Sequence, residues 1–307
     1  MGQRQPGAAT GTAAAVPPPP AGGLLAPDLV GRLRRLRLGS RSRVEGRFAG
    51  AHASRRYGSS LDFADYREYV EGDDLRWVDP HAHARLGRLL VKLFEAEDES
   101  ALRVVLDLSG SMGFGRKAEA AAKTAAALTV VACGGGDRAR LILAGERIDA
   151  GPWLRGPAAL RQAEVRLRSA VTAGLSDLPA ALRRARGEGP RGPVVLISDL
   201  LFDGWPDALR ALATGPGDAA VIHVLGADDL EPRLRGDLRL ADVETDVEVE
   251  VGIAEKALRA YAEARDAWLS EVEQACAGRG IAYARLIDHE SIDRLFSVTL
   301  TQLGVVG

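Results

Sequence analysis

The chain has 307 residues, 46% apolar and 27% charged, and its 40 Lys and Arg residues nearly balance 42 Asp and Glu residues. This composition is typical of a globular protein that buries a core without disulfides, and the net charge of −2 argues against general binding of nucleic acid or of a membrane surface. The two cysteines, Cys133 and Cys276, have no partner thiol or ligand cluster near them in sequence, which excludes a disulfide framework and a zinc ribbon. Because the sequence has no apolar run of about 18 residues and no signal peptide, we expect a cytoplasmic protein without a membrane span.

The first hundred residues divide into a tail and a segment of different composition. Residues 1–27 are rich in Gly, Ala and Pro and are predicted to be disordered. Residues 28–100 form an N-terminal segment with a short helix capped by Asp28, a basic arm, an aromatic and acidic stretch, and a strand over 89–94. The arm carries nine arginines between Arg32 and Arg56, and contact with an acidic protein surface is a plainer interpretation of it than phosphate binding.

Buried strands and helices alternate from residue 101 onwards. Apolar runs predict strands over 102–108, 140–144, 194–197, 221–225 and 281–287, and helical periodicity predicts helices over 116–133, 158–169, 178–186, 255–277 and 291–303. This order predicts an α/β domain over residues 101–307, with a mostly parallel, doubly wound, Rossmann-like sheet. Alternating valines over 238–251 predict a β-hairpin attached to the main sheet.

The loop after the first predicted strand of this domain carries the strongest chemical signal. Asp107, Ser109 and Ser111 form a D-x-S-x-S pattern at the carboxyl end of that strand, where ligands bind in open α/β sheets. One carboxylate and two hydroxyls are donors that suit a hard cation, Mg²⁺ or Mn²⁺ in the first place and Ca²⁺ as a further possibility. The alternative is a polar turn in which Asp107 and Ser109 only cap the next helix.

Two later loops favour the metal interpretation. Asp199 follows the strand over 194–197, and Ser176 precedes a predicted helix, so both are expected at the same edge of the sheet. At this point the sequence resembles the von Willebrand factor A fold, whose metal-ion-dependent adhesion site combines D-x-S-x-S with a Thr and an Asp from two further loops. Asp107, Ser109, Ser111 and Asp199 match that pattern. Ser176 stands where the family usually has Thr, with Thr172 as a less well-placed substitute.

The segment before residue 100 narrows the resemblance. Its residues look like the signature of a bacterial uncharacterised family, number fifty-eight among the domains of unknown function, and they include Gly58, Asp62-Phe63, Arg67-Glu68-Tyr69, Gly72-Asp73-Asp74, Arg76, Asp79, Ala84-Arg85, Val91-Lys92, Glu95 and Glu97. Members of that family typically work beside MoxR-type AAA+ ATPases in maturing or assembling partner complexes. The resemblance therefore implies an adaptor that is not an enzyme, whose divalent ion binds an Asp or Glu presented by a protein partner. Many members begin with two membrane helices, and we expect no such helices here.

Other interpretations remain open at this point. Ser109-Gly110-Ser111-Met112-Gly113 nearly matches the nucleophile elbow of a serine hydrolase, with Ser111 as nucleophile and Asp199 and His289 as its partners. His81 and His83 would share one face of a strand with Asp79, although a solvated surface pair is the plainer interpretation. His223, inside an apolar strand, is expected to be a hydrogen-bonded core residue.

Overall fold

The computed structural model describes residues 14–15, 23–39, 63–71, 73, 75–94, 100–190, 192–215, 217–232, 236–241, 248–253 and 255–307. Most of the predicted disordered tail, and residues 40–56 of the basic arm, lie outside the described residues. The chain divides into a smaller unit, residues 48–99, and a larger unit, residues 1–47 and 100–307. The N-terminal segment predicted over 28–100 thus falls in both units, because its residues 28–39 belong to the larger unit and its residues 63–94 to the smaller one.

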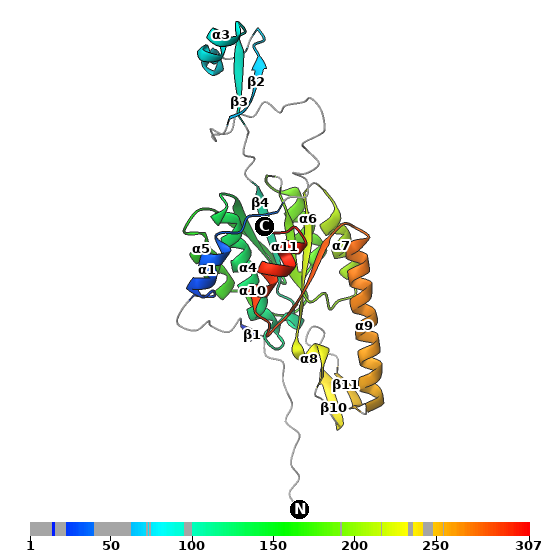
Figure 1. Cartoon of the computed structure of the whole chain (residues 1–307). Helices are drawn as coiled ribbons and strands as arrows, with labels where there is room; N and C mark the ends of the chain where they lie inside the picture. The colour runs from blue at the N-terminus through cyan, green and yellow to red at the C-terminus, as the bar shows by residue number, and fades with distance from the viewer. Residues whose placement is uncertain are drawn as a thin grey trace, which may run out of the picture. The chain divides into compact units, whose positions relative to one another are not determined.

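The larger unit is built on a six-stranded sheet in the order β12-β9-β8-β4-β5-β6 (Figure 1). Five strands run parallel, namely β4 (Ala101–Asp107), β5 (Arg138–Ala144), β8 (Val194–Ser198), β9 (Ala219–Leu225) and β12 (Ala282–Ile287). Strand β4 lies between β5 and β8, and all of its residues are buried. The predicted α/β fold with a mostly parallel sheet is therefore confirmed.

The sheet departs from the prediction at its edge. Strand β6 (Ile148–Leu154) was not predicted, and it pairs antiparallel with β5. It contains Gly151 and Pro152, residues that are tolerated in an edge strand and that mask its sequence signal. The hairpin prediction was right about the strands, β10 (Gly236–Ala241) and β11 (Glu248–Ile253), but wrong about the attachment, because they form a separate two-stranded sheet.

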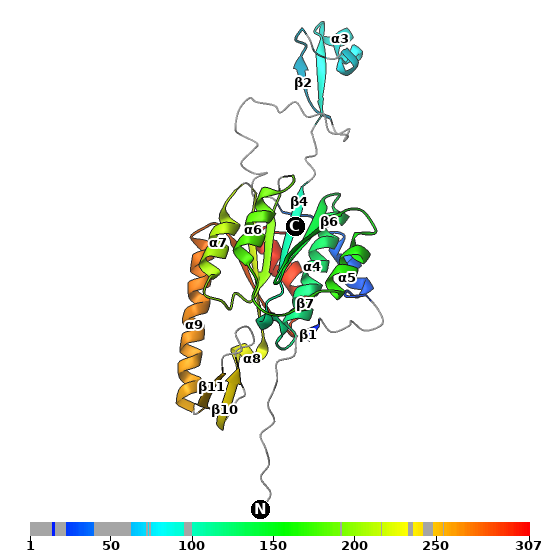
Figure 2. The ribbon, with the colours of Figure 1, turned by 180° about the vertical axis from the view of Figure 1, so that it is seen from behind.

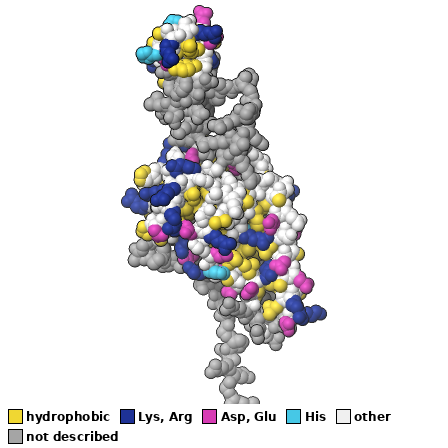
Figure 3. All heavy atoms as spheres, viewed as in Figure 1, with side chains coloured by type: hydrophobic (Ala, Val, Ile, Leu, Met, Phe, Trp, Pro, Cys, Tyr) yellow, Lys and Arg dark blue, Asp and Glu magenta, His cyan; other side chains and the backbone are white. Residues whose placement is uncertain are grey.

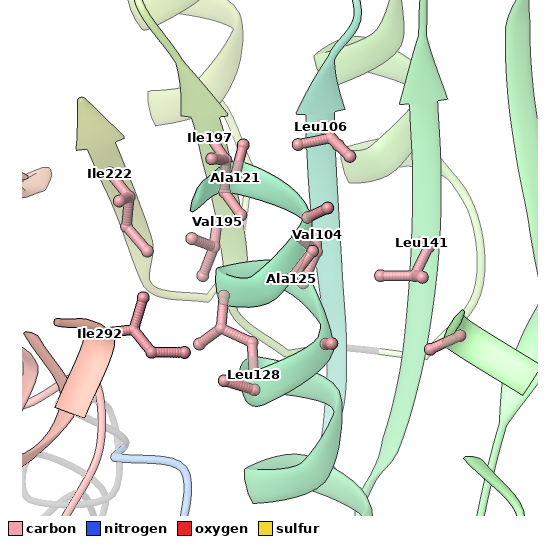
Figure 4. Packing of buried hydrophobic residues seen from close by; sticks show 14 of the residues in the cluster. Val104, Leu106, Ala121, Ala125, Leu128, Leu141, Val195, Ile197, Ile222 and Ile292 are labelled. Atoms are coloured by element: carbon pink, nitrogen blue, oxygen red, sulfur yellow. The ribbon is translucent and has the colours of Figure 1, made fainter. Parts of the chain in front are cut away.

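Helices cover both faces of the sheet (Figures 1 and 2). One face packs against α1 (Pro27–Leu33), α4 (Lys117–Gly134), α5 (Ala159–Arg168) and the C-terminal turns α10 (Ile292–Arg294), Leu295–Thr299 and α11 (Leu300–Gln302). The other packs against α6 (Leu178–Gly187), α7 (Trp205–Ala213) and α9 (Glu255–Ala277). Alternate residues of β4 enter the two cores. Val104 and Leu106 face α4 (Figure 4), and Val105 belongs to the core on the opposite side.

Helix α4 is central to the site because it begins just after the D-x-S-x-S loop. Its alanines let it lie close to the sheet, where Ala121, Ala125 and Leu128 meet the strand side chains (Figure 4). Two buried threonines, Thr124 and Thr129, satisfy their hydroxyls by donating to the carbonyls four residues earlier. Burial of the apolar side chains of α4 against the sheet fixes its first turn at the carboxyl edge of the sheet.

Residues 23–39 are anchored to this domain. Leu33 and Leu38 are buried in the core beneath α1, and Leu38 forms an isolated antiparallel bridge with Val306. The prediction of Asp28 as the helix cap was wrong: Ala26 occupies the N-cap, and Asp28, inside the first turn, pairs with Arg32 at 3.0 Å. On the face seen in Figure 3, basic and acidic side chains lie interspersed over the described surface.

The smaller unit consists of an antiparallel pair, β2 (Phe63–Glu68) and β3 (Leu90–Phe94), with α3 (Pro80–Leu86) between them in sequence. The strand face proposed for His81 and His83 does not exist, because both residues lie on α3. Asp79 is its N-cap: one carboxylate oxygen accepts the backbone N–H groups of His81 and Ala82, and the other accepts the Tyr66 hydroxyl at 2.6 Å. A carboxylate used as a cap, followed by Pro at the first helical position, explains this pattern without a metal.

Candidate functional site

The predicted site residues meet where β4 and β8 end. Asp107, the last residue of β4, is buried and accepts three hydrogen bonds. Its Oδ1 accepts from the backbone N–H of Ser109 at 2.9 Å and from the Ser176 hydroxyl at 2.7 Å, and its Oδ2 accepts from the Ser198 hydroxyl at 2.6 Å. The side chain of Asp107 thus joins all three loops that the sequence analysis singled out.

A second set of contacts links the serines to Asp199. The Ser109 and Ser111 hydroxyls lie 3.1 Å apart, and Ser111 donates to Asp199 Oδ1 at 3.2 Å. Ser109, Ser111 and Asp199 are all buried. The structure therefore brings together all five predicted residues, Asp107, Ser109, Ser111, Ser176 and Asp199, in two hydrogen-bonded groups at one edge of the sheet.

Backbone contacts hold the Ser176 loop beside the D-x-S-x-S loop. The Gly110 N–H donates to the Gly174 carbonyl at 2.8 Å, and the Ala173 N–H donates to the Leu108 carbonyl at 3.0 Å. Gly174 has a φ of 56°, the left-handed conformation that glycine adopts without strain. Ser176 is the hydroxyl that bonds Asp107, while Thr172 is buried in the short strand β7 (Val171–Thr172), which pairs with β1 (Ala14–Ala15).

The turn after β8 is strained, and it fixes Asp199. Leu200 is a non-glycine residue with a φ of 53°. Its N–H donates to the Ser198 hydroxyl at 2.9 Å, and the N–H of Leu201 donates to Asp199 Oδ1 at 3.2 Å. Non-glycine residues in this conformation cost free energy and concentrate at functional sites.

One fully buried cation lies against the site. Lys117, in the first turn of α4, has 1% of its side chain exposed, and its Nζ is 2.8 Å from Asp199 Oδ2 and 3.0 Å from Asp229 Oδ2. Burial alone would lower the pKa of this amine, but the charges of Asp199 and Asp229 and the hydrogen bonds to both outweigh it and raise the pKa above its usual value. Lys117 is therefore charged at neutral pH.

The carboxylates are not fully neutralised by this lysine. Burial in the first place, and the charge of Asp199 in the second, raise the pKa of Asp107 to about 6, although the hydrogen bonds from Ser198, Ser109 and Ser176 act in the opposite direction. Asp107, Asp199 and Asp229 together carry three negative charges against the single positive charge of Lys117. The site thus has an excess negative charge in surroundings that screen charge poorly.

This donor set fits a hard divalent cation. All five predicted ligand side chains offer oxygen, which Mg²⁺, Mn²⁺ and Ca²⁺ prefer, and the excess charge of two matches one such ion. The described residues contain no group of three or more His, Cys, Asp and Glu side chains suited to a metal ion. Any ion at this edge would accordingly depend on serine hydroxyls as well as on Asp107 and Asp199.

The geometry does not support the serine hydrolase alternative. His289 is 59% exposed and lies 3.5 Å from Asp288, while the Ser111 hydroxyl is engaged with Ser109 and Asp199. The histidine next to Asp199 is His223, whose Nε2 is 2.8 Å from the Asp199 carbonyl and whose Nδ1 is 2.7 Å from the Tyr283 hydroxyl. Burial lowers the pKa of His223 to about 4, so the imidazole is neutral at pH 7 and acts as the predicted hydrogen-bonded core residue.

Three residues of this cluster were missed as site residues by the sequence analysis: Lys117, Ser198 and Asp229. One signal for Lys117 exists in the composition, because only four of the 40 basic residues are lysines and one of them begins an alanine-rich helix next to the motif. Ser198 directly precedes Asp199 in the sequence, so it could have been predicted as a site residue from that position. Asp229 lies more than 100 residues from Lys117 and has no local signal.

Comparison with known proteins gives a family match, a sequence relative and structures of similar fold. Residues 65–269 match the family described as "Protein of unknown function DUF58". An uncharacterized protein of Mycobacterium tuberculosis is 31% identical over 268 residues, which cover 83% of each chain. A von Willebrand factor type A structure from Catenulispora acidiphila is 15% identical, with a TM-score of 0.38, over 70% of this chain and 43% of that chain.

A further solved structure corrects the predicted location. An aerotolerance-related membrane protein from Bacteroides fragilis is 17% identical, with a TM-score of 0.40, over 66% of this chain and 99% of that chain. Its description contradicts the expectation of a cytoplasmic protein, which we withdraw. Within the described part of the chain, no helix has both the length and the apolar character needed to cross a bilayer. The family match and the identity to the mycobacterial relative together show that the chain belongs to the DUF58 family of proteins of unknown function.

Proposed function

We propose that this protein is a protein-binding adaptor whose binding site is a divalent metal ion held at the carboxyl edge of the sheet. The observation that carries the proposal is the convergence of two carboxylates, of Asp107 and Asp199, and three serine hydroxyls, which three loops together supply. An oxygen-only site with excess negative charge suits Mg²⁺ or Mn²⁺. Bound there, the ion would supply an open coordination position for an Asp or Glu side chain of a partner.

The chain's own residues have distinct roles in this proposal. Asp107 is the charged ligand, and burial, together with the nearby charge of Asp199, raises its pKa to about 6. Ser109, Ser111 and Ser176 are the neutral ligands, and their hydroxyls can rotate away from their present partners towards an ion. Asp199, held by Lys117 and by the N–H of Leu201, contributes directly or through water.

Exposed apolar side chains around the site support a role in binding proteins. Phe114, Leu175 and Leu201 are 53%, 58% and 44% exposed, and each belongs to one of the three site loops. Large exposed apolar side chains beside a polar site are typical of interaction surfaces.

The resemblance noted in the sequence names a first partner to test, a MoxR-type AAA+ ATPase. The test measures Mg²⁺ and Mn²⁺ binding to the full chain by calorimetry, and capture of such an ATPase by the full chain in Mg²⁺ and in EDTA. We expect Asp107→Ala to reduce the metal affinity at least 100-fold and to abolish metal-dependent capture without unfolding the chain. Asp203→Ala, which removes an exposed carboxylate four residues after Asp199, is the matched control and is expected to behave as wild type.

The outcomes separate the two parts of the proposal. Wild-type protein that binds neither Mg²⁺ nor Mn²⁺ would refute the metal site. Metal binding that is lost in Asp107→Ala, combined with capture that is equal in Mg²⁺ and EDTA, would leave the ion in place but remove it from partner recognition.

A further inference from the structure

We infer that Lys117 is a built-in cation of the site, which holds Asp199 in place when no metal is bound and lowers the affinity of the site for a divalent ion. The inference rests on the proposed function, because it concerns the same carboxylates. It goes further in assigning a role to a residue outside the five expected ligands. Lys117 is a positioning residue, since it acts through Asp199.

Lys117 is buried together with its charge. Lysine is rarely buried without a charged partner, because desolvation of an ammonium group is expensive. Lys117 is 1% exposed and has two carboxylate partners, at 2.8 Å and 3.0 Å. A side chain that served only to fill the core would not need a charge here, so the charge itself is the property that the site uses.

The two carboxylate oxygens of Asp199 have different partners. Oδ2 of this carboxylate accepts from Lys117, while Oδ1 accepts from Ser111 and from the N–H of Leu201. Both oxygens are therefore engaged, and only Oδ1 contacts the serine that the metal would use. Lys117 thereby holds Oδ2, so that Oδ1 is the oxygen of Asp199 that would be offered to an ion.

Lys117 also pairs with Asp229. This residue lies on α8 (Ala227–Leu230), and its Oδ2 accepts from the Gly226 N–H at 3.0 Å in addition to Lys117. Helix α9 holds the same turn, because the Tyr261 hydroxyl donates to the Asp229 carbonyl at 2.7 Å. Asp229 thus offsets part of the lysine's charge from a segment that leads into the β10–β11 hairpin.

These contacts predict opposite effects for two substitutions. Lys117→Met keeps the approximate length of the side chain and removes a positive charge next to the ligands, so Mg²⁺ should bind about tenfold more tightly. Asp229→Asn removes a negative charge and leaves Lys117 on Asp199, so Mg²⁺ should bind several-fold more weakly. A purely structural lysine would give the reverse result for Lys117→Met, because a damaged site binds metal less well.

The experiment is calorimetric titration of the full chain and both variants with Mg²⁺, together with thermal unfolding in EDTA and in Mg²⁺. We expect Lys117→Met to lower the Tm in EDTA and to recover more of it on addition of Mg²⁺ than wild type does. Lys123→Met is the control, because it removes the same charge from the same helix, where Lys123 pairs with Glu119. It should leave the Mg²⁺ affinity unchanged.

The outcomes distinguish this inference from the proposed function. If wild type binds Mg²⁺ and Lys117→Met binds it equally or less tightly while folded, the inference is refuted and the metal site stands. If Lys117→Met binds Mg²⁺ and wild type does not, the inference is supported and the metal-dependent function of the natural chain is refuted. If Lys117→Met does not fold, Asp229→Asn decides, because its side chain is 33% exposed and an unchanged affinity in that variant overturns the inference.

Discussion

The two ends of strand β4 bury opposite charges in different ways. Near its start, Arg103 is 4% exposed and donates to the carbonyls of Ala101, Glu188, Pro190 and Gly192. At its end, Asp107 accepts from two serine hydroxyls and one backbone N–H. Burial, and then the charge of Arg140, lower the pKa of Arg103, as burial and Asp199 raise that of Asp107.

The difference lies in the partners. Backbone carbonyls are fixed by the chain, and the Arg103 guanidinium is further covered by the Trp153 ring, whose centroid is 5.6 Å away. The serine hydroxyls around Asp107 can rotate, and the nearby negative charge of Asp199 repels that of Asp107. A buried charge enclosed by fixed backbone groups is structural, whereas one enclosed by rotatable hydroxyls and further charges is prepared to accept a ligand.

The largest expected effect concerns the start of β4, where Arg103 is enclosed by backbone carbonyls. Arg103→Met should lower the free energy of unfolding by roughly 3 kcal/mol, because it leaves several buried carbonyls without a donor. Denaturant unfolding measures the loss, which should be equal in EDTA and in Mg²⁺. Arg183→Met, at an exposed position of α6, is the control and should change stability by less than about 0.5 kcal/mol. A loss below about 1 kcal/mol for Arg103→Met would show that its partners are satisfied by other groups.

The fold was largely predictable because its strands are buried on both faces. Such strands are continuous apolar runs, which stand out in a sequence. The same property concealed Arg103, since one arginine in the run over 102–108 does not alter the pattern. Strand β6 was missed because Gly151 and Pro152 interrupt it, and the helix of the smaller unit was missed although Asp79 and Pro80 are typical of a helix start.

The site was predictable only where a residue lies at the end of a strand or helix. Asp107 and Asp199 follow strands and Ser176 precedes a helix, so topology alone brings them together. Lys117 and Asp229 meet through tertiary packing of α4 against the turn after β9, and no periodicity or spacing encodes that contact. Sequence reasoning thus found the five predicted ligands and missed the positive charge of Lys117 and its second partner, Asp229.

The next largest effect concerns the other end of β4, where the pH dependence of stability tests the surroundings of Asp199. His223 is buried between the Asp199 carbonyl and the Tyr283 hydroxyl, and burial lowers its pKa to about 4, from an ordinary value of 6.5. The unfolded chain therefore binds a proton between pH 6.5 and 4 that the folded chain does not, and the contribution of His223 to stability falls as the pH falls through this window. At about 1.4 kcal/mol per pH unit, we expect His223 alone to cost roughly 2 to 3 kcal/mol between pH 7 and 4.5, which the protonation of Asp107 in the folded chain partly offsets.

The variant His223→Gln isolates this contribution. A glutamine amide can donate to the Asp199 carbonyl but does not titrate. Urea unfolding at several pH values should show that wild type loses more stability than His223→Gln over the same window. Parallel pH profiles of the two proteins would contradict the assignment of the loss to His223.

The smallest effect returns to Asp107, where removing the charge should stabilise the metal-free protein. Because the folded pKa of Asp107 is about 6 and its unfolded value is 3.8, the ionised carboxylate destabilises the fold at pH 7. Asp107→Asn keeps the shape and should raise the free energy of unfolding in EDTA by about 1 kcal/mol, less than the pKa difference implies, because its amide is a poorer partner for Ser198. In Mg²⁺ the order should reverse, since only wild type is stabilised by binding the ion. A marked destabilisation of Asp107→Asn in EDTA would place Asp107 with Arg103 among the structural charges, and the contrast between the two ends of β4 would fail.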